Sequence, residues 1–448
     1  MRASATPASL PRDAPPRVPA FGSAERIEGS LSEMLRGMRG SEILRIAAEI
    51  RRLVATGRPV CNLTVGDFDP RQFPIPRGLL EGIHEALRSG ETNYPPANGL
   101  LALREAVAER TARDLGVHYP TESTLIASGV RPLIFAAFHA VLDPGDPVLY
   151  GVPSWNVDHY GYLTGARGIP VVTRREHEFH PTLEDLAPHL SSAKLLCLCS
   201  PANPTGTMIA PAELTRITVA VVEENRRRER IGGPVLFLLY DQVYGSIVHG
   251  ATAHASPVAL VPEAAPWTIL LDGISKAFAG TGLRVGWSLA PPVLIAKMSD
   301  FLGHVGAWAP RAEQVATARF LHDHAAIAAF REVMDRGLRE RLDALCDGFA
   351  RLRHAGYPVD FVRPEGAMYL SLQLDLVGRT IAGRAIRSNE EIRELLLEAA
   401  GVAAVPFQAF GLPEETGWFR LSVGAVSIEE IEAGISRVGQ MLGSACGS

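Results

Sequence analysis

Cysteine is scarce in this sequence: five residues are scattered along the chain, with no CxxC pair and no Cys/His spacing typical of a metal site. We therefore expect no bound metal, and such cysteine usage indicates a reducing, cytoplasmic compartment. No apolar run is long enough to cross a bilayer, so we expect no membrane partner. The net charge of -5 gives no electrostatic basis for binding nucleic acid.

The length of 448 residues exceeds one ordinary core and indicates two domains. Residues 1–24 are rich in Ala, Pro and Ser and lack the apolar stretch of a secretory signal, so we expect a disordered N-terminal arm. A transit peptide is the alternative, because the arm has arginines and few acids. We expect residues 25–75 to form the N-terminal part of a small domain, 76–325 a large domain, and 326–448 the C-terminal part of the small domain.

The middle of the chain alternates short apolar strands with helical stretches. The predicted strands are apolar throughout, which is typical of a sheet buried on both faces. The pattern predicts an α/β fold, with a mostly parallel central sheet flanked by helices and a smaller α+β domain. Strands are predicted at 124–127, 147–150, 169–172, 195–199, 235–240, 268–271, 285–289, 366–374 and 419–423. Helices are predicted within 27–56 and at 79–88, 100–115, 312–350 (with a possible break near 325), 390–400 and 428–442.

Polar residues stand just after four of these strands. Asn203 follows strand 195–199, Asp241 and Tyr244 follow 235–240, Lys276 follows 268–271, and the segment 128–131 follows 124–127. Because ligands of open α/β sheets bind beyond the carboxyl ends of the strands, we expect these residues to converge on one edge of the sheet.

Lysine is scarce too, and Lys276 is the only lysine at a strand end. Pyridoxal 5′-phosphate (PLP) requires a lysine amine for its Schiff base and a carboxylate that keeps its ring nitrogen protonated, the place that Asp241 suits. Taken singly, Lys276 reads equally as a surface lysine and Asp241 as a turn or helix cap. Their context, with Tyr244, indicates a PLP site with Lys276, Asp241 and Tyr244 as catalytic residues.

Further residues match the remaining parts of PLP. Asn203 and Tyr244 are candidate partners of the 3′-oxygen, although Asn-Pro-Thr-Gly alone reads equally well as a turn. Trp155 is a candidate for stacking on the ring, with an ordinary half-buried Trp as the alternative. The phosphate is expected at the beginning of a helix, where backbone N–H groups and the helix dipole favour an anion, together with a guanidinium. These candidates are Gly129, Val130, Arg131 and Arg284.

The order and spacing of these motifs resemble the class I/II aminotransferases of the aspartate aminotransferase superfamily, the fold-type I PLP enzymes. The resemblance runs from about Val60 to the C-terminal helix. The motifs that carry it are Asn62–Gly66, Asn93–Gly99 with Leu103-Arg104, Asp143–Asp146, Ser200–Gly206, Asp241–Tyr244, Ser275-Lys276 with Arg284, and Phe419–Ser422.

The resemblance implies further roles. Tyr94 reaches the cofactor phosphate of a neighbouring subunit, which implies a homodimer with shared active sites. Arg420 grips the substrate α-carboxylate as a bidentate pair, and Gly66 lies against the substrate. Ser275 contacts the cofactor, while Asn203 and Trp155 also border the substrate. Lys276 holds PLP as the internal aldimine and then moves the proton between Cα and C4′.

The sequence departs from the family pattern at three positions. Gly273 replaces a serine that often binds phosphate three residues before the lysine, so phosphate contacts should depend more on Arg284 and on the backbone of 129–131. Gln242 replaces an acidic residue, a change that we expect to matter little. Val130 is bulkier than the usual residue before the phosphate helix, which nothing in the sequence explains.

The expected reaction is transamination between an L-amino acid and a 2-oxo acid. A lyase, decarboxylase or oxidase on the same fold is the alternative, because the motifs define the cofactor and not the fate of the carbanion. A PLP-binding sensor is a third reading, but the N-terminal arm is too short and proline-rich for a DNA-binding module. Arg311 is a candidate for a second substrate carboxylate, with a surface arginine as the alternative. Residues expected to border the pocket are Phe68, His304, Trp308, Tyr369, Phe407 and Gln408.

Overall fold

The computed structural model describes residues 23–55, 57–381 and 383–443, and its contacts divide the chain into the units 1–40 and 41–448. The first unit contains α1 (Ala24–Gly29) and α2 (Glu33–Gly37), capped by the hydroxyl groups of Ser23 and Ser32. The predicted helical pattern of 27–56 is therefore divided among α1, α2 and α3 (Glu42–Ala55), because glycine and serine residues interrupt it. All but the last two residues of the predicted 1–24 arm lie outside the described part of the chain.

In the second unit a seven-stranded sheet has the order β2-β8-β7-β6-β5-β3-β4. Strand β8 runs antiparallel to both of its neighbours, so the other six strands share one direction. This confirms the predicted mostly parallel sheet, and the observed bounds lie within two residues of most predicted ones. The strands are β2 (Thr124–Ala127), β3 (Pro147–Val152), β4 (Arg167–Val172), β5 (Leu195–Cys199), β6 (Phe237–Asp241), β7 (Thr268–Gly273) and β8 (Gly286–Leu289).

Successive residues of the central strands belong to two different cores. In β5, Leu195 and Cys197 face one core, and Leu196 and Leu198 face the other. The first core is covered by α6 (Val130–Val141), α7 (Val157–Thr164) and α12 (Pro292–Val305). The second is covered by α4 (Arg77–Arg88), α5 (Leu101–Leu115), α8 (Leu183–Leu190), α9 (Pro211–Arg230) and α13 (Arg311–Leu321). Burial on both faces explains why these strands are apolar throughout.

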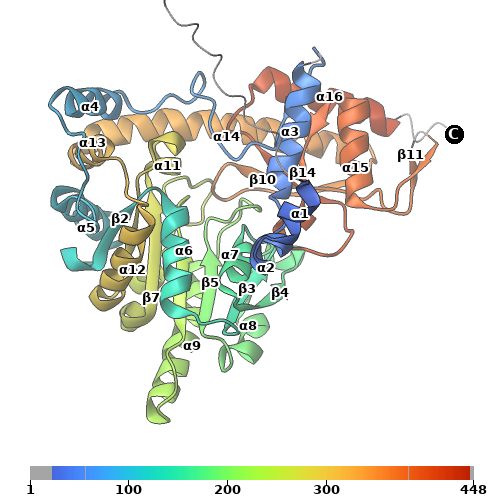
Figure 1. The fold of residues 1–448 in the computed structure, drawn as a ribbon. Coiled ribbons are helices and arrows are strands. Elements are labelled where there is room, and N and C mark those ends of the chain that lie inside the picture. Colours follow the sequence, from blue (N-terminus) through green and yellow to red (C-terminus); the bar gives the residue numbers. More distant parts are fainter. Residues whose placement is uncertain (1–22, 56, 382, 444–448) are drawn as a thin grey trace, which may run out of the picture. The chain divides into compact units, whose positions relative to one another are not determined.

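A second, antiparallel sheet follows in the chain, with the order β14-β15-β10-β9. The long helix α14 (His324–His354) connects its core to that of the large sheet (Figure 1). Ile327 packs in the large-sheet core, whereas Met334 to Phe349 pack in the small-sheet core. The elements that follow α14 include β9 (Val359–Val362), β10 (Tyr369–Leu374), the short pair β11 (Thr380–Ile381) and β12 (Arg384–Ala385), α15 (Asn389–Leu395), β14 (Val405–Pro406), β15 (Trp418–Ser422) and α16 (Ile428–Gly443).

The predicted break in the helical region 312–350 is confirmed between α13 and α14, where the Asp323 carboxylate caps α14 by accepting from the Ala326 N–H. Strand β1 (Cys61–Asn62) pairs in parallel with β13 (Val402–Ala403), so the chain before α4 is joined to the C-terminal part. We propose from this pairing that the part of 25–75 that lies in the second unit, 41–75, belongs to the small domain together with 326–448. Among the described residues, no helix has the length and apolar character needed to cross a membrane.

Candidate active site

A cavity of about 620 Å³ lies at the edge of the large sheet where β5, β6 and β7 end. Parallel strands bring their carboxyl ends to one edge, so residues far apart in the sequence line this cavity together. It also reaches the beginning of α6 and Arg420 in the middle of β15. The predicted site residues that line it are Gly66, Val130, Arg131, Trp155, Asn203, Asp241, Tyr244, Ser275, Lys276, Arg284 and Arg420.

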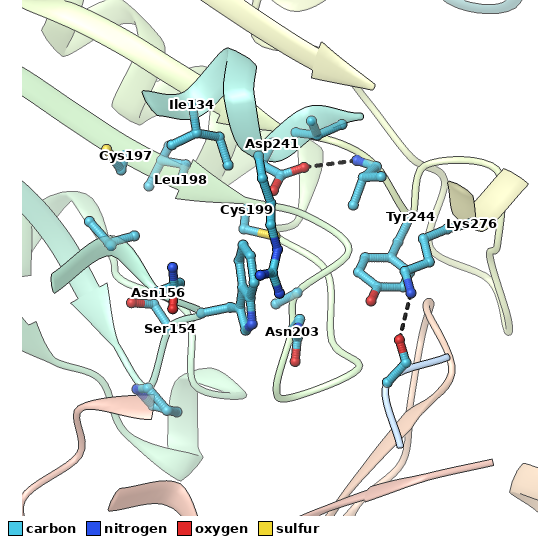
Figure 2. Close-up of a pocket in the computed structure, with 18 of the residues that line it drawn as sticks. Ile134, Ser154, Asn156, Cys197, Leu198, Cys199, Asn203, Asp241, Tyr244 and Lys276 are labelled. Carbon is cyan, nitrogen blue, oxygen red and sulfur yellow. Dashed lines mark hydrogen bonds between the residues drawn. The ribbon is translucent and has the colours of Figure 1, made fainter. Parts of the chain in front are cut away.

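Lys276 lies in the short helix α11 (Ile274–Ala277), directly after β7. Its Nζ donates to the carbonyl oxygen of Gly66 at 2.6 Å and lies 5.8 Å from the ring centroid of Tyr244 (Figure 2). Burial, against the opposing effect of Asp67 and with a contribution from nearby arginines, lowers the pKa of Lys276 from 10.5 to about 8. A lysine amine with a lowered pKa has the nucleophilic character that a carbonyl-binding lysine requires.

Asp241 ends β6 on the floor of the cavity. One carboxylate oxygen accepts from the backbone N–H of Val243 at 3.0 Å (Figure 2). Burial raises the pKa of the Asp241 carboxyl from 3.8 to about 6. A carboxylate that burial destabilises gains most from a cationic partner, as a protonated pyridine nitrogen would be.

Cys197 and Cys199 both line the cavity from β5, and Cys199 is the register partner of Asp241. Cys197 also belongs to the first core of the large sheet. Burial raises the pKa of both thiols, so neither is a reactive thiolate.

Tyr244 is buried, and its hydroxyl shares a hydrogen bond of 2.5 Å with the hydroxyl of Tyr369 from β10. Burial raises the pKa of Tyr244, and Tyr369 adds to the shift. Tyr369, predicted to border the pocket, does line it. The pair of phenols therefore offers hydroxyl donors beside Lys276, and not ionised oxygens.

Arg420 lines the cavity from β15, a strand of the small sheet, and is 2% exposed. Its Nη1 donates to Asn203 Oδ1 at 3.0 Å and its Nη2 to the Thr64 carbonyl at 2.6 Å. The guanidinium lies 4.7 Å from the Tyr369 ring centroid and 5.0 Å from that of Phe410. Among the described residues Nε is buried and has no hydrogen-bond partner, so the second N–H groups of Nη1 and Nη2 are the ones left for a carboxylate.

Gly66 has little room for a side chain. A Cβ there would lie 3.1 Å from the Tyr369 hydroxyl and 3.7 Å from Arg420 Nη1. The backbone of Gly66 thus borders the same open space as the guanidinium, which is where the resemblance places the substrate.

The Arg284 guanidinium packs against Gly129, which precedes α6. It donates to the carbonyl groups of Thr281 at 2.6 Å and Ser128 at 3.0 Å. A Cβ on Gly129, whose φ is +82°, would lie 2.2 Å from Arg284 Nη2, so only glycine fits there. The N-terminus of α6, Arg284 and buried Ser275 all border the cavity, and a helix N-terminus beside a guanidinium is suited to binding an anion.

The departures at 273 and 130 have a common steric explanation. A Cβ at Gly273 would lie 2.9 Å from the Val285 carbonyl oxygen, 3.0 Å from Gly286 Cα and 3.6 Å from Val130 Cγ2. Glycine lets these backbones approach, and Val130 occupies the adjoining space. A serine hydroxyl at 273 therefore has no room here.

Arg131 and Trp155 form the outer wall. The Arg131 guanidinium lies 4.7 Å from the Trp155 ring centroid, which is a cation–π contact. The indole face is thus partly covered by Arg131 before any ligand stacks on it.

Other predicted residues lie outside the cavity. Tyr94 is 81% exposed, and its ring packs edge-on against Trp308 at 5.1 Å. Arg311 forms an ion pair of 2.5 Å with Glu91 instead of facing the cavity. Of the six expected border residues only Tyr369 lines the cavity. The Phe68 ring centroid lies 5.7 Å from Lys276 Nζ without lining it, and His304, Trp308, Phe407 and Gln408 are likewise absent from the lining.

The sequence analysis missed several lining residues, among them Asp67, Thr281 and Tyr160. Asp67 directly follows Gly66, and its exposed carboxylate oxygen accepts from the Thr281 hydroxyl at 2.6 Å. The available signal was weak: an acidic residue next to a predicted substrate-binding glycine, and a threonine between the lysine and Arg284.

The donor set fits PLP. The cavity offers a buried amine for the aldehyde, a buried carboxylate for the ring nitrogen, phenol and amide groups for the 3′-oxygen, and a glycine-lined cationic site for the phosphate.

Comparisons with known proteins agree with this geometry. The family described as "Aminotransferase class I and II" matches residues 58–438. The aspartate aminotransferase of Streptomyces avermitilis is 32% identical over 424 residues, covering 93% of this chain and 98% of that protein. A probable aspartate/prephenate aminotransferase of Thermus aquaticus is 33% identical over 388 residues, covering 85% and 93%.

A solved structure of the aspartate aminotransferase from Thermus thermophilus with maleate is similar with a TM-score of 0.81 at 29% identity, covering 92% of this chain and 99% of that one. The aspartate aminotransferase from Rhizobium meliloti has a TM-score of 0.83 at 26% identity, with the same coverage. The chain therefore belongs to the class I and II aminotransferase family, and it is a PLP-dependent enzyme that transfers an amino group between an amino acid and a 2-oxo acid.

Proposed function

We propose that Lys276 carries PLP and that the enzyme transaminates an acidic L-amino acid. The observation that supports this most directly is the buried Lys276 amine, which lines one cavity together with the Asp241 carboxylate and the Arg420 guanidinium. Bound PLP supplies the electron sink that stabilises negative charge developing at the substrate Cα.

The protein groups divide the remaining work. Asp241 would hold the proton on the ring nitrogen, and Asn203 and Tyr244 would donate to the 3′-oxygen. The N-terminus of α6 and Arg284 would bind the phosphate. Lys276, whose amine would be free once substrate is bound, would be the base that moves the proton of the substrate Cα.

Arg420 orients the substrate by its α-carboxylate, with Gly66 leaving room beside it. The second carboxylate is assigned to Arg131, whose guanidinium faces the same cavity from the outer wall. Arg311 is not needed for this role, because Glu91 already neutralises it. The acidic substrate class is further supported by the relatives named aspartate aminotransferase and by the Thermus thermophilus structure with maleate, a dicarboxylate.

The test is single-turnover spectroscopy of the holoenzyme with a panel of L-amino acids and no oxo acid. We expect L-aspartate or L-glutamate to convert the cofactor to pyridoxamine phosphate, with the matching 2-oxo acid recovered. Lys276→Ala should abolish the covalent PLP bond, measured by borohydride reduction and mass spectrometry. Regeneration of PLP with ammonia or carbon dioxide would instead assign the chain to the lyase or decarboxylase alternative.

A homodimer with shared sites belongs to the same proposal. The proposed dimer is supported by Tyr94, a large aromatic side chain that is 81% exposed in the single chain although its ring contacts Trp308. Mixing inactive Lys276→Ala with weakened Tyr94→Ala chains should restore activity through hybrid dimers that contain one intact site, and no recovery after subunit exchange would contradict sharing. A cytoplasmic location is proposed from the free cysteines of the described chain.

A further inference from the structure

The loop that carries Gly66 is joined to the segment 276–284 by two hydrogen bonds. Lys276 Nζ donates to the Gly66 carbonyl at 2.6 Å, and the Thr281 hydroxyl donates to Asp67 Oδ1 at 2.6 Å. The backbone N–H of Phe68 also donates to Asp67 Oδ1, at 2.8 Å. Oδ1 is thereby occupied twice, whereas Oδ2 accepts no hydrogen bond from the described residues.

The charges around Lys276 are unbalanced. Three arginines disfavour a positive charge on the amine: Arg131 from α6, Arg284 after the 3₁₀ turn Thr281–Leu283, and Arg420 from β15. Asp67 is the carboxylate that opposes them, since Asp241 lies on the cavity floor at the end of β6. The neutral phenols that face the amine are Tyr244 and Tyr369.

We propose that Asp67, held in place by Thr281, is a positioning residue for Lys276 that serves as the counter-anion of the released amine. The inference rests on the proposed role of Lys276 as the cofactor lysine. As the free amine takes the proton from the substrate Cα, it becomes an ammonium among three guanidinium groups. The Asp67 carboxylate stabilises that ammonium, and the Gly66 carbonyl gives it direction.

The sequence contains only three lysines, Lys194, Lys276 and Lys297, so the basicity of Lys276 can be measured directly. The enzyme in its pyridoxamine-phosphate form, in which Lys276 is free, is pulse-labelled with acetic anhydride across a pH series. Mass spectrometry then gives the labelling midpoint of Lys276, with Lys297, whose side chain is 75% exposed, as the internal reference. Asp67→Asn keeps the size of the side chain and removes its charge.

We expect Asp67→Asn to lower the Lys276 midpoint by about one pH unit, because an opposite charge nearby favours the charged form by that order. Thr281→Val should lower it less, since the carboxylate remains. Asp69→Asn is the matched control: it lies in the same loop, pairs with Arg71 at 2.7 Å and should leave the midpoint unchanged. An Asp67→Asn midpoint equal to that of the unmodified enzyme, or a shift as large in Asp69→Asn, would overturn the proposal.

Turnover supplies a second measurement. Asp67→Asn should lower kcat about tenfold with little change in KM, because the carboxylate acts on the proton transfer and not on substrate binding. Borohydride reduction of the PLP form distinguishes a failure of the proposed function from a failure of the proposed role of Asp67. A PLP tag on Lys194 or Lys297, or no tag, refutes the proposed function; a tag on Lys276 with an unmoved midpoint in Asp67→Asn refutes only the role of Asp67.

Discussion

Replacement of Arg420 by lysine tests whether the fork of its guanidinium, and not only its charge, recognises the substrate. Arg420 has five N–H groups, of which one on Nη1 is used by Asn203 and one on Nη2 by Thr64. Of the other three, the N–H on Nε is buried, so the second N–H groups of Nη1 and Nη2 remain for a ligand. The rings of Tyr369 and Phe410 hold the guanidinium plane in place. A lysine retains the positive charge but offers a single nitrogen to the same partners.

The lysine variant therefore loses at least one charge-assisted hydrogen bond to the α-carboxylate. Such a bond contributes about 1.5–3 kcal/mol. That loss corresponds to a decrease of roughly 10- to 150-fold in kcat/KM. Arg420→Gln, which also removes the charge from a buried site, should lose more, about 3–5 kcal/mol of transition-state stabilisation.

The assay compares L-aspartate with β-alanine, which is the same molecule without the α-carboxylate. Single-turnover conversion of the cofactor by L-aspartate should slow in both Arg420 variants, whereas the slow reaction of β-alanine should be unchanged. Arg311→Lys is the matched control, because Arg311 is a half-buried arginine paired with Glu91 outside the cavity. Equal losses for the two substrates would refute the carboxylate role of Arg420.

Three further predictions concern ionisation. Asp241→Asn should lower kcat by about 10²- to 10⁴-fold, and turnover within tenfold of the unmodified enzyme at equal PLP content would contradict its role. Burial lowers the pKa of Lys276 to about 8, so between about pH 8 and 10.5 the unfolded chain binds more protons and stability rises with pH. At pH 7 the Lys276→Met apoprotein should thus be more stable than the unmodified apoprotein, by up to about 3 kcal/mol. The difference between their denaturant midpoints should decrease as the pH approaches 10.5, and a difference that does not change with pH would contradict the buried amine as its cause. Burial and the neighbouring Glu365 raise the pKa of Glu178, so the folded chain binds more protons and loses stability as the pH rises above about 4.5. Glu178→Gln should raise the melting temperature more at pH 8 than at pH 4. An effect of the substitution that is the same at both pH values would contradict the repulsion between Glu178 and Glu365.

The large sheet could be predicted because each of its central strands is buried on both faces. Strand 195–199 was predicted with its observed bounds, since its apolar run ends at the polar turn that begins with Ser200. The region 27–56 was harder, because the helical spacing of its apolar residues continues across Gly29 and Gly37, where the structure ends α1 and α2. The periodicity of apolar residues along the sequence does not show whether a helix packs against other parts of the fold.

The site divides in the same way. Lys276, Asp241 and Asn203 were predictable because they stand directly after strands whose carboxyl ends meet at one edge. Asp67 and Thr281 were not, because each lies in an irregular segment whose path depends on packing between distant parts of the chain.

The sequence by itself determined the strand and helix pattern and the residue types that PLP chemistry requires, because both are local properties of composition and spacing. Only the tertiary structure decided the electrostatics. Burial lowers the pKa of Lys276 and raises that of Asp241, and neither burial nor the neighbouring charges can be read from adjacent residues. Arg420 meets Asn203 across 217 residues of sequence, so the orientation of its fork exists only once both sheets have formed and packed together.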